Sequence, residues 1–139
     1  MKYLITLLSV LFFVSCSSEA PKDLSKEVDQ LIAEDKYEQA LTMIENTSPE
    51  ETEADIDLLK EKVHLNYGIY LEYRGPESSS MRDRMTSALQ QYIEVLKIND
   101  QNQKAISEIE QIMGIYETMP DNSPGEEIIA ELNKLGFDY

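Results

Sequence analysis

The sequence contains very few of the residue types that most often carry chemistry. It has one cysteine, Cys16, so no disulfide can form within the chain. It has one histidine, His64, so a tetrahedral zinc site and a histidine-based nucleophilic triad both lack a complete set of residues. We therefore expect no catalytic residue, no metal site and no cofactor, and we expect His64 to be a packed or surface side chain.

Positive charge is also scarce. The chain has 12 lysines and arginines against 27 aspartates and glutamates, for a net charge of −15. Such a surface repels phosphate backbones and anionic lipid headgroups, so we expect no binding to nucleic acid and a domain that stands off the membrane. Carboxylates are abundant, which leaves a two-acid hydrolase as an alternative; it would need paired acids in a cleft with one raised pKa.

Long apolar runs are absent apart from residues 4–14. This run is shorter than the roughly 20 residues that a membrane-spanning helix needs. It follows Met1-Lys2-Tyr3, and one positive charge before a short apolar run is typical of a secretory signal. The run fits an ordinary cleaved signal peptide, and it also fits a buried apolar helix that happens to hold a cysteine.

The segment Phe13-Val14-Ser15-Cys16 resembles the lipobox of bacterial lipoproteins. The resemblance implies cleavage before Cys16 and lipid on its sulfur. Residues 1–15 would then be the signal peptide, and residues 16–23 the lipidated cysteine and a polar tether. We expect a lipid-anchored protein of the cell envelope that faces the periplasm or the cell surface, with the outer membrane as one possible location.

The rest of the chain, residues 24–139, shows helical periodicity and no strand pattern. Ser48, Ser80, Asn102 and Ser123 are expected to cap helices, and Gly136 to end the last one. We predict an all-α fold of six helices in antiparallel hairpins. The expected helices cover residues 24–34, 37 onward, 49–74, 81–98, 102–118 and a last helix after Ser123.

Small and large apolar residues alternate at helical spacing around an Asn-Asp turn. Ala88 precedes Tyr92 by one turn, and Ala105 opens the next stripe; Tyr67-Gly68 lies in the preceding helix. This pattern resembles the tetratricopeptide repeat family over residues 62–118 and, in part, over 24–47. The resemblance implies an α-solenoid with a closing helix at its C-terminal end. A glycine inside a helix is expected where a neighbouring helix packs on bare backbone, as at Gly68.

In this family the first helix of each unit lines a concave groove that holds a partner segment. By that resemblance, the groove residues are Leu65, Ile69, Glu72 and Tyr73 from one helix, with Ser107, Gln111 and Ile115 from the next. The alternative is that these side chains form the core and its rim.

The chain has three arginines, Arg74, Arg82 and Arg84, all in or beside one loop. Guanidinium groups bind carboxylates through two parallel hydrogen bonds, so these residues are candidates for gripping an acidic segment or a C-terminal carboxylate of a partner. The alternative is local pairing with Glu72, Glu77 or Asp83.

Together these observations predict a membrane-anchored scaffold or assembly adaptor for protein–protein interaction. Its partners would be other envelope proteins or peptide segments, and lipid on Cys16 would hold it to the membrane. The alternative is a helical lipoprotein that binds a small solute or lipid, in an apolar pocket between the helix at 49–74 and the last helix.

Overall fold

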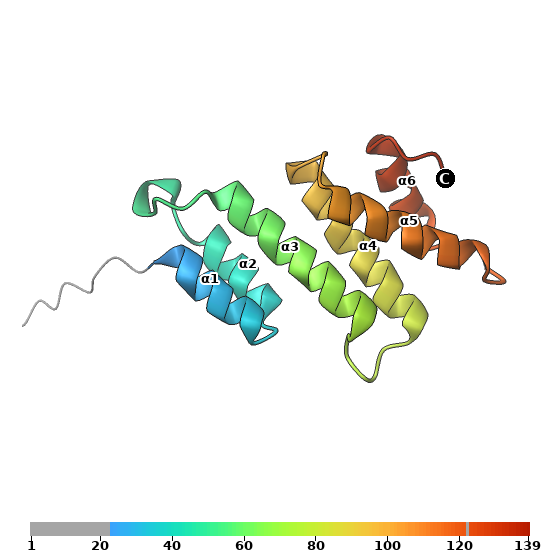
Figure 1. Cartoon of the computed structure of the whole chain (residues 1–139), viewed down its shortest axis with the longest axis horizontal. Helices are drawn as coiled ribbons and strands as arrows, with labels where there is room; N and C mark the ends of the chain where they lie inside the picture. Colours follow the sequence, from blue (N-terminus) through green and yellow to red (C-terminus); the bar gives the residue numbers. More distant parts are fainter. Residues whose placement is uncertain (1–22, 122) are drawn as a thin grey trace, which may run out of the picture.

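A computed structural model describes residues 23–121 and 123–139, and this part of the chain is helical with no strand (Figure 1). The predicted all-α class and the number of α-helices are confirmed. The signal peptide, Cys16 and the tether up to residue 22 lie outside the described residues. The elements are α1 (Leu24–Ala33), α2 (Tyr37–Glu45), the short 3₁₀ helix η1 (Pro49–Glu51), α3 (Ile56–Tyr73), α4 (Met81–Ile98), α5 (Gln103–Glu117) and α6 (Glu126–Lys134).

From α1 to α5, helices that follow one another in the chain pack side by side. The most extensive packing joins α3 to α4, and further contacts join α1 to α2, α2 to α3 and α4 to α5. Two pairs skip an element, because α1 also reaches α3 and α6 packs against α4. Figure 1 shows α3 running through the middle of the molecule, with α1 and α2 on one side of it and α4 on the other.

Short polar side chains begin four of the helices. The predicted caps Ser80 and Asn102 are confirmed, since their side-chain oxygens accept the backbone N–H of Asp83 (3.1 Å) and of Ala105 (2.9 Å). Asp23 and Asp55 cap α1 and α3 in the same way. Each bond satisfies one of the N–H groups that a helix N-terminus leaves without a partner.

The prediction of one continuous helix over residues 49–74 is wrong. Ser48 and Glu51 do form a reciprocal cap, and the Ser48 N–H donates to the Glu51 carboxylate (3.3 Å), but it closes only the single turn of η1. Thr52 is extended (φ −138°, ψ 145°), and its hydroxyl accepts the Ala54 N–H (3.0 Å). This local bond competes with a helical backbone, so the helix restarts only at the Asp55 cap.

The two ends of α6 gave one wrong and one correct prediction. Ser123 does not cap α6; its hydroxyl accepts the N–H of Gly125 (3.1 Å), and Gly125, at φ +112°, is the residue before the helix. Gly136 does end the helix, at φ +95°. Gly136 donates to the Asn133 carbonyl and the next residue to the Leu132 carbonyl, each at 3.1 Å, which is a Schellman motif.

The buried side chains form two clusters that share α3. The first core cluster joins α1 and α2 to the N-terminal half of α3, and the second joins the C-terminal half of α3 to α4, α5 and α6. Tyr67 and Tyr70 contact both clusters. The first consists of Leu24, Val28, Tyr37, Ala40, Ile44, Leu59 and Val63. The second consists of Leu71, Met85, Ala88, Leu89, Tyr92, Ile93, Val95, Leu96, Ala105, Ile109, Ile112, Met113, Tyr116, Ile128 and Leu132.

The predicted contact between bare backbone and a large side chain is confirmed at Gly68. A Cβ atom on Gly68 would lie 2.5 Å from Cε1 of Tyr92, and the Tyr92 ring is fully buried. Ala40 and Ala88 are fully buried as well, as the nesting of neighbouring helices requires. The absence of a side chain at Gly68 therefore sets how closely α3 and α4 approach.

We expect Gly68→Ala to lower the free energy of unfolding by about 1–3 kcal/mol, because the added methyl overlaps a ring that has no free space to move into. Gly114→Ala in α5 is the matched control: nothing lies within 4 Å of a Cβ there, so the better helix former should add up to about 1 kcal/mol. Urea unfolding followed by circular dichroism measures both, and equal effects of the same sign would contradict the packing argument.

Candidate functional site

The predicted groove residues lie along neighbouring sides of α3 and α5, and we call this set the α3–α5 surface. Its apolar members Leu65, Ile69 and Ile115 are partly buried and pack against the second core cluster. Its other members face outward to different extents: Tyr73 is 57% exposed, Ser107 and Gln111 are exposed and Glu72 is half-buried. The apolar members thus form the rim of the core, and the rest form a polar surface above it.

Three of these residues bond directly to one another. The side-chain amide of Gln111 donates to Oε1 of Glu72 (2.8 Å) and to the hydroxyl oxygen of Tyr73 (3.0 Å). The Tyr73 hydroxyl donates in turn to Oε2 of Glu108 (3.0 Å). These bonds hold α5 beside α3 along the polar part of the surface.

Sequence reasoning missed three members of this network. The Tyr92 hydroxyl donates to Oε2 of Glu72 (2.8 Å), and Lys104 pairs with Oε1 of Glu108. Glu108 is only 3% exposed, the one buried charged residue of the described chain. A signal was present, since Lys104 and Glu108 have the i, i+4 spacing of a helical ion pair.

The two carboxyl groups have opposite pKa shifts. Burial, together with the nearby Glu108 carboxylate, raises the pKa of Glu72 above the ordinary value. Burial also acts to raise the pKa of Glu108, but the hydrogen bonds from Lys104 and Tyr73 outweigh it and hold that pKa below the ordinary value. Each of the four carboxylate oxygens accepts a bond from a side chain of the protein. The pair therefore acts here as a bridge between helices.

The three arginines bind the protein itself, and none of them pairs with Glu72, Glu77 or Asp83. Arg74 forms an ion pair with Asp35 (2.6 Å). Arg82 donates to the backbone carbonyls of Asp121 and Ser123 (3.1 Å each) and lies over the Tyr116 ring. Arg84 donates to the carbonyl of Arg74 (2.7 Å). The predicted partners of local pairing were wrong, although all three side chains bond to other groups of the described chain.

His64 is packed between helices. Its Nδ1 lies 2.9 Å from Oε1 of Gln91, which joins α3 to α4. Within residues 23–121 and 123–139, no three histidine, cysteine, aspartate or glutamate side chains are grouped so that they could hold a metal ion.

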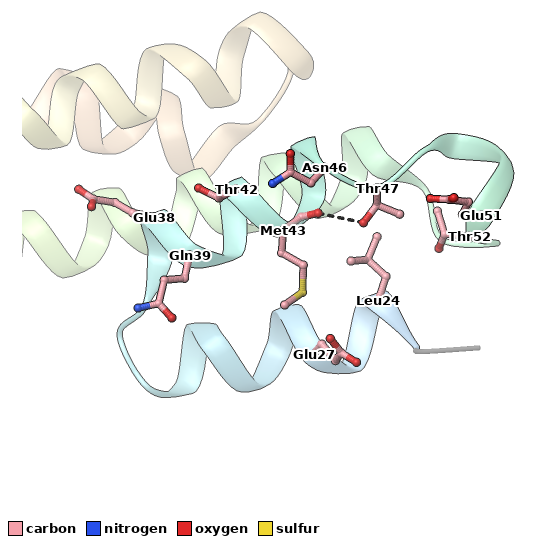
Figure 2. Close-up of a pocket in the computed structure, with 10 residues that line it drawn as sticks. All are labelled: Leu24, Glu27, Glu38, Gln39, Thr42, Met43, Asn46, Thr47, Glu51 and Thr52. Carbon is pink, nitrogen blue, oxygen red and sulfur yellow. Dashed lines mark hydrogen bonds between the residues drawn. The ribbon is translucent and has the colours of Figure 1, made fainter. Parts of the chain in front are cut away.

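A cavity of about 730 Å³ lies in the first hairpin, between α1, α2 and η1 (Figure 2). Leu24 and Met43 are its apolar lining residues, and Figure 2 shows both side chains directed into the space between α1 and α2. The other lining residues are Glu27, Glu38, Gln39, Thr42, Asn46, Thr47, Glu51 and Thr52. This cavity lies in a different place from the expected apolar pocket, which was predicted between α3 and the last helix.

Comparison of the chain with protein-family models, curated proteins and solved structures finds no match. Among the helices in the described part of the chain, none is both long and apolar enough to cross a bilayer.

We expect the free energy of unfolding of Glu72→Gln, relative to that of the parent, to be greater at pH 7 than at a pH below the ordinary glutamate pKa. A carboxyl whose pKa is raised on folding contributes stability that is present at low pH and is lost as the pH rises through the folded-state pKa. Thermal unfolding at several pH values measures this. Glu110→Gln, on the exposed side of α5, removes the same charge as a control, and a constant advantage of Glu72→Gln at all pH values would contradict the argument.

Proposed function

We propose that this protein is a lipid-anchored helical scaffold of the bacterial cell envelope, which binds a segment of another envelope protein on its α3–α5 surface. The observation that carries the proposal is the pairing of α3 and α5. Their side chains are bonded to one another and backed by the second core cluster, so exposed groups such as Tyr73 are held in fixed positions. A preorganised surface binds a partner at lower entropic cost than a mobile one.

The packing of alternate helices supports a solenoid similar to tetratricopeptide repeats over residues 24–139. In such an array the first helices of successive units lie next to one another, and so do the second helices. Here α1 contacts α3, α3 bonds to α5 through Gln111, and α4 contacts α6. We assign α6 as the closing helix, because it buries Ile128 and Leu132 against the second core cluster.

We propose binding instead of catalysis, because the paired acids Glu72 and Glu108 are engaged by other side chains. An exposed tyrosine beside polar groups is also typical of a protein interface, where aromatic residues contribute most of the binding energy. The anchor is proposed from the lipobox at Cys16, and the tether would lead into α1 at Asp23. The excess of acidic residues would keep the domain away from anionic headgroups.

For the anchor, we expect Cys16→Ser to move the protein from the membrane fraction to the soluble fraction when cells are lysed and fractionated. Loss of the thiol removes the acceptor of the lipid, and acyl chains are what hold such a protein to a bilayer. Labelling with a clickable fatty acid should mark the parent chain and leave Cys16→Ser unmarked. A variant that stays with the membrane and still carries label would contradict the anchor.

For the surface, we expect Ser107→Arg to reduce capture of a cross-linked envelope partner at least about tenfold, because it places a long charged side chain on the exposed part of the α3–α5 surface. Gln90→Arg on α4 is the control, since it makes the same change in charge and introduces the same side chain at an exposed position outside that surface. Quantitative mass spectrometry after cross-linking in cells measures both. Equal recovery of the same partner with the two variants would contradict the proposed surface.

A further inference from the structure

A second, smaller cavity has aromatic walls. It measures about 310 Å³ and lies where the α1–α2 turn meets α3 and the start of the α3–α4 loop; we call it the tyrosine pocket. The Tyr37 ring stacks on the Tyr67 ring (centroids 4.9 Å apart, planes at 9°) and leans against the Tyr70 ring (5.4 Å, 41°). Its lining residues are Asp35, Lys36, Tyr37, Glu38, Gln39, Tyr67, Tyr70 and Pro76.

Tyrosine hydroxyls hold two carboxylates at this pocket. The Tyr37 hydroxyl donates to Oδ1 of Asp35 (3.0 Å), and the Tyr67 hydroxyl donates to Oε1 of Glu38 (3.2 Å). Burial and the Asp35 carboxylate raise the pKa of Tyr37 to about 12, so this hydroxyl remains a donor at neutral pH. Negative groups and the faces of aromatic rings, which carry negative charge density, therefore border the same space.

Two helix ends add to the negative potential. Helix α1 ends beside the pocket, where Asp35 adopts φ +57° and the N–H of Lys36 donates to the Leu31 carbonyl (2.8 Å). The C-terminus of α3 lies close by, since Arg74, which follows it, reaches Asp35. In Figure 1 the α1–α2 turn and the α3–α4 loop lie on the same, lower side of the molecule. The C-terminus of a helix carries partial negative charge and favours cations.

A cation of the protein already uses one side of this site. The guanidinium of Arg74 lies 2.6 Å from Asp35 and 5.0 Å from the centroid of the Tyr70 ring, yet its side chain is 63% exposed. Lys36 pairs with Glu34 (2.5 Å). Among the described residues no lysine or arginine pairs with Glu38, whose hydrogen-bond partner is the Tyr67 hydroxyl. The site thus holds one guanidinium, that of Arg74. Its second carboxylate, Glu38, forms no ion pair with any lysine or arginine of the described residues.

We propose that the tyrosine pocket binds an arginine side chain from a basic segment of the partner, with Glu38 as its counter-ion and Tyr67 and Tyr70 as its walls. A planar guanidinium can stack on a tyrosine ring and donate to a carboxylate at once, which an ammonium group does less well. The chain has 27 acidic and 12 basic residues, and its net negative charge attracts a basic segment. The inference rests on the scaffold function above and gives the chemistry of its partner.

Arg74 acts as an internal competitor in this scheme. It is largely exposed and held by a single ion pair, so it can leave the Tyr70 ring at little cost. A partner arginine can then use the ring face and Asp35 as well as Glu38. Removing Arg74 should therefore strengthen binding. This is opposite to the effect expected if Arg74 itself gripped an acidic partner.

The test is a titration of the isotope-labelled full chain in a maltoside detergent, whose headgroup carries no cation that could enter the pocket. The probe is the peptide acetyl-Gly-Arg-Gly-Arg-Gly-amide, and its counterpart carries citrulline, which is nearly isosteric and uncharged. We expect the arginine peptide to give saturable amide shifts at residues 35–39 and 67–70, and the citrulline peptide to give none. Equal shifts from both peptides would overturn the proposal.

Three variants locate the binding. Glu38→Gln keeps an acceptor for the Tyr67 hydroxyl, so it should fold normally and weaken binding of the arginine peptide about three- to tenfold. Glu45→Gln removes the same charge from an exposed position of the same helix outside the pocket, and should change binding less than about twofold. Arg74→Gln should tighten binding. Equal weakening by Glu38→Gln and Glu45→Gln, or weaker binding by Arg74→Gln, would overturn the proposal.

The two proposals fail separately. The peptide titration needs neither a membrane nor a partner protein. Saturable binding of the arginine peptide, without any captured partner, would support the tyrosine pocket and contradict the scaffold function. Partner capture that is reduced by Ser107→Arg, with no binding of the arginine peptide, would support the scaffold function and contradict the tyrosine pocket.

Discussion

The contact between Gly68 and Tyr92 is the constraint on which the rest of the array depends. Because Gly68 has no side chain, the Tyr92 ring can lie directly on the backbone of α3, and its hydroxyl then reaches Glu72. Glu72 in turn accepts the amide of Gln111, which fixes α5 beside α3. One missing side chain thus determines the spacing of three helices and the geometry of the α3–α5 surface.

Features set by neighbours in the chain could be predicted from the sequence. The helix spans followed from the period of the apolar residues. The caps at Ser80 and Asn102 are also local, because each side chain accepts the backbone N–H of the residue three positions later. The break at Thr52 was hidden, because the reciprocal cap at Ser48 is a strong start signal and the second cap at Asp55 lies in an acidic run where many residues resemble it. Local rules cannot rank two start signals that compete for one segment.

The composition of the site depended on residues far apart in the chain. Tyr73 and Glu108 are separated by 35 positions, and Arg74 and Asp35 by 39, so no local pattern pairs them. The family resemblance did place Glu72, Tyr73 and Gln111 on one surface. It could not indicate that a buried carboxylate would support them, because a glutamate is usually exposed. Glu108 is buried here with bonds to Lys104 and Tyr73, and Tyr73 lies far from it in the sequence.

The division of α3 between two core clusters has a consequence for synthesis. Residues 24–45 are synthesised before α3, but Leu59 and Val63 of α3 complete the core cluster that they form. The cluster around Leu24 and Val28 therefore stays incomplete until the chain as far as Val63, 18 residues beyond Glu45, has emerged. A nascent chain of this kind needs protection from aggregation in its N-terminal part. A chaperone that binds the α1–α2 hairpin would shield it until α3 has emerged.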